Sequence, residues 1–175
     1  SSFIGDYGEK HSKFEGYKEL AYLHPKWYKD EKDVLKELDI KKNEEYFIVR
    51  LVSWQASHDV GYKGASKEDI LKLINTLEKR GRVLLSSEYY DKEFEEYYIK
   101  LHPAKIHTLM NHSTMYFGEG ATMATEAAVL GKPSLFISPL SGKLGYLEEL
   151  EKIYGLLFSF KTINDSLNKI GRAHV

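Results

Sequence analysis

The sequence predicts an α/β domain in which a parallel β-sheet is covered by helices on both faces. From Tyr46 onward, short apolar runs alternate with helical patterns of about 10–15 residues. Such an alternation requires crossover connections between strands that run in the same direction, which places helices on the faces of the sheet. The limits of the elements follow from capping residues, glycines and prolines along the chain.

The first strand-and-helix unit has the clearest signals. The stretch Tyr46–Trp54 is rich in β-branched and aromatic residues and therefore predicts a strand. A polar, glycine-containing loop leads to Ser66, and Asp69 follows three residues later as its capping partner. The apolar residues of this helix share one face and are Ile70, Leu73, Ile74 and Leu77. Gly81 ends the helix, and Arg82–Ser87 predicts the second strand.

The alternation continues to the end of the chain. The segment Glu88–Leu101 is ambiguous, because its aromatic residues fit helical spacing while Tyr98–Leu101 also fits a short strand. The later elements are a helix at Ala104–Ser113, a strand at Thr114–Gly118, a helix at Ala121–Leu130, a strand at Ser134–Ser138, a helix at Tyr146–Gly155 and a strand at Leu156–Phe160. Together these elements predict a Rossmann-like domain over residues 46–169.

Both ends of the chain differ from this pattern. We interpret residues 1–45 as an interdomain approach segment that contains a short helix at Asp33–Leu38. Near the other end, Thr162 and Asp165 form a capping pair that opens a last helix. The final letters, "IGRAHV", look like a translated sequencing adapter. We therefore interpret Ile170–Val175 as a tail foreign to the fold.

Composition excludes several classes of function. The 175 residues are 42% hydrophobic and 29% charged, which is typical of a globular domain rather than a disordered chain. A net charge of −1 gives no bulk attraction to nucleic acid or to anionic membranes. The sequence contains no cysteine, so disulfides, thiolate zinc sites and cysteine nucleophiles are excluded. With no apolar run of membrane-spanning length, we expect a cytoplasmic protein.

The stretch "GEGATMATEAAVLGKP" carries the strongest functional signal. It places Gly120, Ala121 and Thr122 at a helix N-terminus beyond a strand, where free N–H groups and the helix dipole favour a diphosphate. Glu126 follows Thr122 by four residues and shares its face, about 6 Å deeper. A carboxylate there can accept hydrogen bonds from a ribose diol, or else it only favours the dipole or faces solvent. We expect the buried face to be formed instead by Met123, Ala127 and Leu130.

Other polar residues lie at the same predicted edge of the sheet. The loop after the first strand carries the substrate-binding candidates Ser53, Trp54 and Lys63, and the weak catalytic candidates His58 and Asp59. A solvated loop is the alternative. Further candidates for binding are Ser86 after the second strand, His107 at a helix start, and Glu148 and Glu149 after the strand and loop that begin at Ser134; core or surface roles are the alternatives.

We expect no metal site and no bound cofactor. His102, His107 and His112 are five residues apart, so on a helix they point about 140° from one another and cannot share a metal ion. No Asp-x-Asp pair is present, which argues against a metal-dependent GT-A transferase.

Three stretches resemble one protein family. The segments "YFGEGATMATEAAVLGKP", "RLVSWQASHDVGYKG" and "GYKELAYLHP" are similar to an uncharacterised archaeal and bacterial family. That family is related to the non-hydrolysing UDP-N-acetylglucosamine 2-epimerases and to GT-B glycosyltransferases. The resemblance covers roughly Phe14–Phe160 and implies the C-terminal, nucleotide-binding half of a two-domain GT-B protein, whose partner is a missing N-terminal Rossmann-like domain.

The resemblance also implies a ligand class. In the epimerases, an Asp-Ser-Gly-Gly stretch precedes a helix whose Glu holds the ribose. Here the stretch from Glu119 to Thr122 matches the first feature and Glu126 matches the second, whereas the epimerases' His-Arg pair after the first strand of this half has no counterpart. We therefore expect a nucleoside diphosphate sugar as substrate, with glycosyl transfer slightly favoured over epimerisation.

Two other classes of function remain as alternatives. An NAD-dependent oxidoreductase is disfavoured, because the pattern Gly118-x-Gly120-x-x-Met123 lacks the third glycine and comes late in the sheet. A non-catalytic ligand-binding module is the other alternative. Since a GT-B site closes between two domains, we expect this chain alone to bind nucleotide weakly without turnover.

Overall fold

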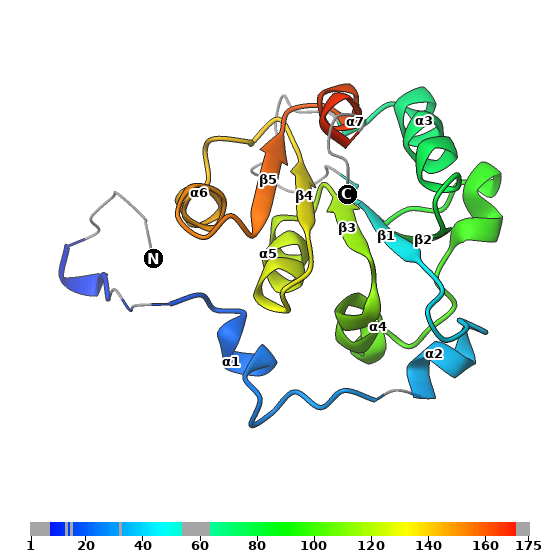
Figure 1. Ribbon diagram of the computed structural model, residues 1–175. Helices are drawn as coiled ribbons and strands as arrows, with labels where there is room; N and C mark the ends of the chain where they lie inside the picture. The colour runs from blue at the N-terminus through cyan, green and yellow to red at the C-terminus, as the bar shows by residue number, and fades with distance from the viewer. Residues whose placement is uncertain (1–7, 13, 15, 32, 54–63, 171–175) are drawn as a thin grey trace.

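The computed structural model describes residues 8–170 apart from 13, 15, 32 and 54–63. In this part of the chain five strands form one parallel sheet in the order β2-β1-β3-β4-β5 (Figure 1). The strands are β1 (Tyr46–Leu51), β2 (Arg82–Ser87), β3 (Met115–Gly118), β4 (Ser134–Ile137) and β5 (Leu157–Phe160). The predicted α/β class and Rossmann-like sheet are confirmed.

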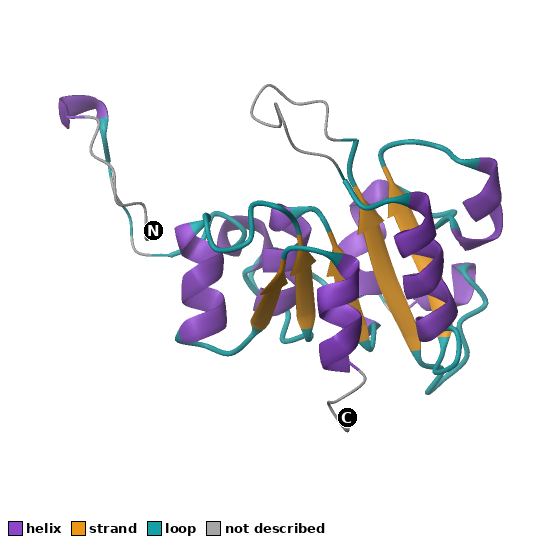
Figure 2. Ribbon diagram, turned by 90° about the horizontal axis from the view of Figure 1, so that it is seen from above, coloured by secondary structure: helices purple, strands orange, loops and turns teal. Residues whose placement is uncertain are grey.

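Helices cover both faces of the sheet (Figures 1 and 2). One face packs against α3 (Lys67–Leu77) and α7 (Ile163–Ile170) around the buried side chains of Leu73, Ile74 and Phe117. The opposite face packs against α4 (Ile106–His112), α5 (Ala121–Val129) and α6 (Gly145–Lys152). The helix α5 is the central one of that layer, because it contacts α4 on one side and α6 on the other.

Two helices begin at the caps that the sequence predicts. The Ser66 side chain accepts a hydrogen bond from the Asp69 amide and opens α3. The Thr162 hydroxyl accepts from the Asp165 amide at 3.2 Å and opens α7 in the same way. Helix α7 extends to Ile170, which the sequence assigned to the foreign tail, and residues 171–175 lie outside the described part.

The ambiguous segment after β2 is neither a regular helix nor a strand. It contains the 3₁₀ helix η2 (Lys92–Tyr97), whose first turn is capped by Asp91, and Tyr98 then makes an isolated parallel bridge to Leu85. A second 3₁₀ turn, η3 (Pro103–Lys105), leads into α4. The aromatic spacing reflects one buried anchor, Phe94, which packs against the α3 face of the sheet.

From Tyr17 onward, the N-terminal segment packs on the face of the sheet that α5 covers. The whole N-terminal segment contains η1 (Gly8–Lys10), α1 (Leu20–Leu23) and α2 (Asp33–Glu37). Of these, α2 matches the short helix predicted at Asp33–Leu38. Val34, Leu38 and Ile40 are buried within the core on that face. Among the residues described, no helix has both the length and the apolar character needed to cross a membrane.

The cap of α3 supports a stability prediction. Ser66→Ala removes the acceptor of the Asp69 amide, so we expect the free energy of unfolding to fall by about 1 kcal/mol. Urea denaturation measures this loss. Ser12→Ala, at an exposed position outside the helices, is the control and should leave the midpoint unchanged. Equal midpoints for wild type and Ser66→Ala would contradict the capping role.

Candidate functional site

The strand order places a topological switch point between β1 and β3. From β1 the chain crosses through α3 to β2 on one side, whereas from β3 it crosses through α5 to β4 on the other. The loops that leave the carboxyl ends of β1 and β3 therefore diverge. In open parallel sheets, such a switch point is where ligands bind.

The N-terminus of α5 lies at this switch point. Gly120 is its N-cap residue and no side chain caps the helix, in contrast to α3 and α7. The first-turn residues Ala121 and Thr122 are half-buried. The positive end of the helix dipole and the first-turn N–H groups can therefore receive an anion. This places Gly120, Ala121 and Thr122 at the predicted edge of the sheet.

Two glycines at the start of this turn have different roles. A Cβ atom on Gly118 would clash with the Tyr116 hydroxyl oxygen and lie 2.7 Å from the Arg50 Cβ, which is closer than packing permits. A Cβ atom on Gly120 would meet its nearest neighbour, the Arg50 Cγ, at an ordinary 3.5 Å. Gly118 is therefore required for packing of β3 on β1, whereas Gly120 leaves the helix end open to a ligand.

Glu119 connects the start of α5 to both ends of the loop that follows β1. Its carboxylate accepts hydrogen bonds from the Val52 amide at 3.1 Å and from the Ala65 amide at 2.7 Å. These two amides lie at opposite ends of the loop that follows β1. The Glu119 backbone N–H donates to the Arg50 carbonyl at 3.1 Å, which extends the pairing of β3 with β1 beyond the strand. Glu119 also lines a pocket of about 290 Å³ beside the α3 and α7 N-termini.

Arg50 links the carboxyl ends of β1 and β2. Its guanidinium donates to the Ser86 hydroxyl at 2.9 Å and to the Glu88 carboxylate at 2.6 Å. Glu88 also accepts from the Ser53 amide at 3.1 Å and hydroxyl at 3.2 Å. Partial burial opposes ionisation of Glu88, but Ser53 and Arg50 outweigh it and lower the pKa of this carboxyl. Two predicted ligand residues, Ser53 and Ser86, are thus engaged within the protein.

Glu126 differs from the prediction that it lies off the core. It is 6% exposed, and its carboxylate Oε1 accepts a 2.6 Å hydrogen bond from the Tyr22 hydroxyl. The His107 Nε2 lies 3.3 Å from the same oxygen, and the His107 and Tyr22 rings are 5.5 Å apart. The reason is that α5 is central in its layer, with α4 beside it and α1 above it, so neighbours cover the face that its own sequence leaves polar. Conversely, the expected core residues Met123 and Leu130 are only partly buried.

A second contact joins the N-terminal segment to α5. The Lys18 ammonium lies 3.4 Å from the Thr122 hydroxyl oxygen and 3.8 Å from the Glu19 carboxylate. Glu19 itself is 1% exposed, and its Oε1 has no hydrogen-bond partner among the described residues. The segment Tyr17–Leu23 therefore lies against Thr122 and Glu126, the two predicted ligand residues of α5.

The remaining candidates are not brought into this cluster. Glu148 forms an ion pair with Lys152 of its own helix. Glu149 lies near the Tyr17 hydroxyl; burial first, and this carboxylate second, raise the pKa of Tyr17 to about 12. The predicted loop residues Trp54, His58, Asp59 and Lys63 lie outside the described residues, so the weak catalytic assignment to His58 and Asp59 stays a prediction.

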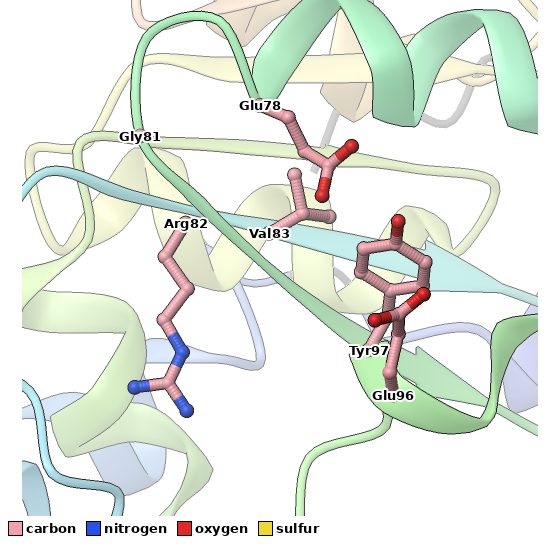
Figure 3. A pocket seen from close by; sticks show the side chains of 6 residues that line it. All are labelled: Glu78, Gly81, Arg82, Val83, Glu96 and Tyr97. Carbon is pink, nitrogen blue, oxygen red and sulfur yellow. The ribbon is translucent and has the colours of Figure 1, made fainter.

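A pocket of about 340 Å³ lies at the other end of the sheet. It is lined by Gly81, Arg82 and Val83 at the start of β2, together with the side chains of Glu78, Glu96 and Tyr97 (Figure 3). The Arg82 guanidinium points away from the two carboxylates and donates to the Leu38 carbonyl at 2.7 Å. Since ligands of parallel sheets bind at the carboxyl ends of the strands, this pocket is separate from the candidate site.

Sequence reasoning missed the contributions of Tyr22, Lys18 and Glu119. Tyr22 and Lys18 lie in the "GYKELAYLHP" stretch, but each contacts α5 across a separation of 104 residues. Their one-turn spacing, which matches that of Thr122 and Glu126, is a weak signal in the sequence. Glu119 directly precedes a glycine cap, where an acid normally suggests only a dipole interaction.

One protein family matches nearly the whole chain. Residues 3–168 match the model of the family described as "Protein of unknown function (DUF354)". The chain belongs to this DUF354 family. No curated protein sequence matches the chain.

Two solved structures are similar to this DUF354 chain. One is a histidine-to-alanine variant of the wall teichoic acid polymerase TagF, with 13% identity, a TM-score of 0.53, and coverage of 79% of this chain and 37% of that chain. The other is UDP-GlcNAc 2-epimerase from Neisseria meningitidis bound to UDP-GlcNAc, with 13% identity, a TM-score of 0.52, and coverage of 81% and 40%. The DUF354 chain thus has a GT-B-like fold and spans less than half the length of either structure.

The two glycines provide a matched pair of variants. Gly118→Ala forces a Cβ against the Tyr116 hydroxyl and Arg50, so we expect a loss of about 1–3 kcal/mol in the free energy of unfolding. Gly120→Ala meets only ordinary contacts and should change stability by less than about 0.5 kcal/mol. Chemical denaturation of both variants tests this difference. Equal losses would show that Gly120 is also a packing residue.

The lowered pKa of Glu88 predicts a pH-dependent contribution to stability. A carboxyl whose folded pKa is depressed stabilises the fold where the unfolded-state carboxyl is ionised, and this contribution is lost as the pH falls through the folded pKa. Glu88→Gln should therefore be less stable than wild type at pH 7, and the difference should shrink below about pH 4. Urea unfolding at both pH values measures it; a difference that does not change with pH would contradict the assignment.

Proposed function

We propose that this DUF354 chain is the nucleotide-binding half of a two-domain GT-B-type enzyme that acts on a nucleoside diphosphate sugar. The observation that carries the proposal is the uncapped N-terminus of α5 at the β1–β3 switch point, with Thr122 and Glu126 one turn apart on the same helix. The fold shared with an epimerase solved with UDP-GlcNAc bound supports the ligand class.

The diphosphate would bind at the first turn of α5. The N–H groups of this turn and the Thr122 hydroxyl are donors, and the helix dipole favours negative charge. Gly120 has no side chain to obstruct the approach of a phosphate to the backbone. Lys18, whose side chain is 67% exposed, adds a positive charge beside Thr122.

The ribose would bind at Glu126. A carboxylate in a buried position accepts a stronger hydrogen bond than one in water, because the local dielectric is low. Since the Tyr22 hydroxyl and His107 already occupy the surroundings of Oε1, a ribose hydroxyl either uses Oε2 or replaces Tyr22.

Glycosyl transfer is the reaction that this arrangement favours. When the bond between sugar and diphosphate breaks, negative charge accumulates on the departing diphosphate. Donors fixed at a helix end stabilise that charge without having to reorganise. The sugar and its acceptor would lie toward the second domain.

The role of Glu126 is tested with a matched pair of ligands. We expect Glu126→Gln to bind the tightest ligand among UDP, ADP, GDP and CDP about tenfold or more weakly, because a charged hydrogen bond contributes roughly 1.5–3 kcal/mol. The corresponding 2′,3′-dideoxy ligand lacks the diol, so it should bind wild type weakly and be nearly insensitive to the substitution. Isothermal titration calorimetry measures both affinities.

The controls separate ligand binding from folding. Glu68→Gln, at an exposed position on α3, should leave the affinity unchanged, and thermal unfolding should show that Glu126→Gln remains folded. Equal losses for the ribose and dideoxy ligands would mean that Glu126 supports the helix rather than the ribose. If wild type binds none of the four nucleotides, the proposed function is wrong.

A further inference from the structure

Two residues of the N-terminal segment, one turn apart, contact two residues of α5 that are also one turn apart. The Lys18 ammonium meets the Thr122 hydroxyl at 3.4 Å, and the Tyr22 hydroxyl meets the Glu126 carboxylate at 2.6 Å. We call Tyr17–Leu23 the cover segment. It lies over the α5 residues that the proposed function assigns to the diphosphate and the ribose.

We propose that the cover segment regulates this site by competing with the ribose for Glu126, so that nucleotide binding and docking of Tyr22 exclude each other. This inference rests on the proposed function. It adds that the ribose position of the protein without nucleotide is filled by a hydroxyl of its own chain.

The geometry favours competition over sharing. A carboxylate oxygen has two lone pairs, and Glu126 Oε1 already faces the Tyr22 hydroxyl and the His107 Nε2. Glu126 is 6% exposed, whereas Tyr22 is 40% exposed, so the tyrosine ring lies at the surface above the carboxylate. A ribose that arrives from solvent reaches Glu126 when this ring has moved aside.

The exchange conserves charge and hydrogen bonding. Burial first, and then the hydrogen bond with Glu126, raise the pKa of Tyr22, so its hydroxyl remains a neutral donor at pH 7. A ribose hydroxyl is a neutral donor as well. Replacing one by the other therefore leaves the Glu126 carboxylate with a hydroxyl donor in either state.

The docked state of the cover segment carries a penalty that undocking relieves. Its helix α1 has four residues and no side-chain cap, and such short helices have little stability of their own. Glu19 is buried with Oε1 lacking a hydrogen-bond partner among the described residues, and its ion pair with Lys18 is long, at 3.8 Å. A buried carboxylate oxygen without a hydrogen bond is costly, so returning Glu19 to water offsets part of the loss of the Tyr22 hydrogen bond.

Removing the Tyr22 hydroxyl tests the competition. Tyr22→Phe should bind the tightest of UDP, ADP, GDP and CDP about tenfold more tightly, because a larger fraction of the protein has Glu126 available. Its affinity for the matching 2′,3′-dideoxy ligand should equal that of wild type. Tyr28→Phe is the matched control: its hydroxyl lies 3.5 Å from the His107 carbonyl instead, and its affinity should not change.

Hydrogen exchange gives an independent readout. Amides of Leu20–His24 should exchange several-fold faster in wild type saturated with the ribose ligand than with the dideoxy ligand. Slower or unchanged exchange of these amides would overturn the competition. Unchanged or weaker binding of the ribose ligand by Tyr22→Phe would also overturn it, even where Glu126→Gln confirms the ribose contact. If neither wild type nor Tyr22→Phe binds any of the nucleotides, the competition and the proposed function both fail.

Discussion

The close packing of Gly118 on Arg50 determines how this end of the sheet is built. With no Cβ at Gly118, the last residue of β3 approaches the Arg50 Cβ directly. The chain then turns into α5 within two residues, while the Glu119 amide still pairs with the Arg50 carbonyl. As a result, the first turn of α5 lies immediately beside the loops of β1. A larger residue at 118 would separate the strands where the ligand edge is formed.

The packing of Gly118 on Arg50 also affects where the charged side chains near the N-terminus of α5 find their partners. The Arg50 guanidinium extends toward β2, where Ser86 and Glu88 receive it, rather than toward the helix end. Glu119 is satisfied by two backbone amides of the β1 loop. Glu88 and Glu119 therefore receive their hydrogen bonds from donors other than the first turn of α5. That first turn keeps its donors and its dipole for an anion, even though the protein has a net charge of −1.

Local signals in the sequence were sufficient for the fold but not for the site. The caps at Ser66 and Thr162 depend on residues three apart, and the strands depend on short apolar runs, so both are visible without tertiary information. The open N-terminus of α5 was also predicted, because glycine and small residues directly follow a strand. The burial of Glu126 was not predicted, because it arises from Tyr22, which is 104 residues away, and from the neighbouring helices. A helical pattern describes one helix and contains no information about which segment covers it.

The packing of the N-terminal segment explains how Tyr22 can leave Glu126 without loss of the fold. Val34, Leu38 and Ile40 are buried in the core beneath the sheet, and they hold the segment that precedes β1 in place. Tyr22 lies upstream of this anchor on the four-residue helix α1, which has one buried side chain, Leu23, and Lys18 lies in the turn before that helix. The energetic cost of undocking is therefore limited to a few contacts, whereas the core contacts of Val34, Leu38 and Ile40 persist. A site covered by such a weakly held segment can respond to a ligand whose hydrogen bonds to Glu126 are only slightly stronger than those of Tyr22.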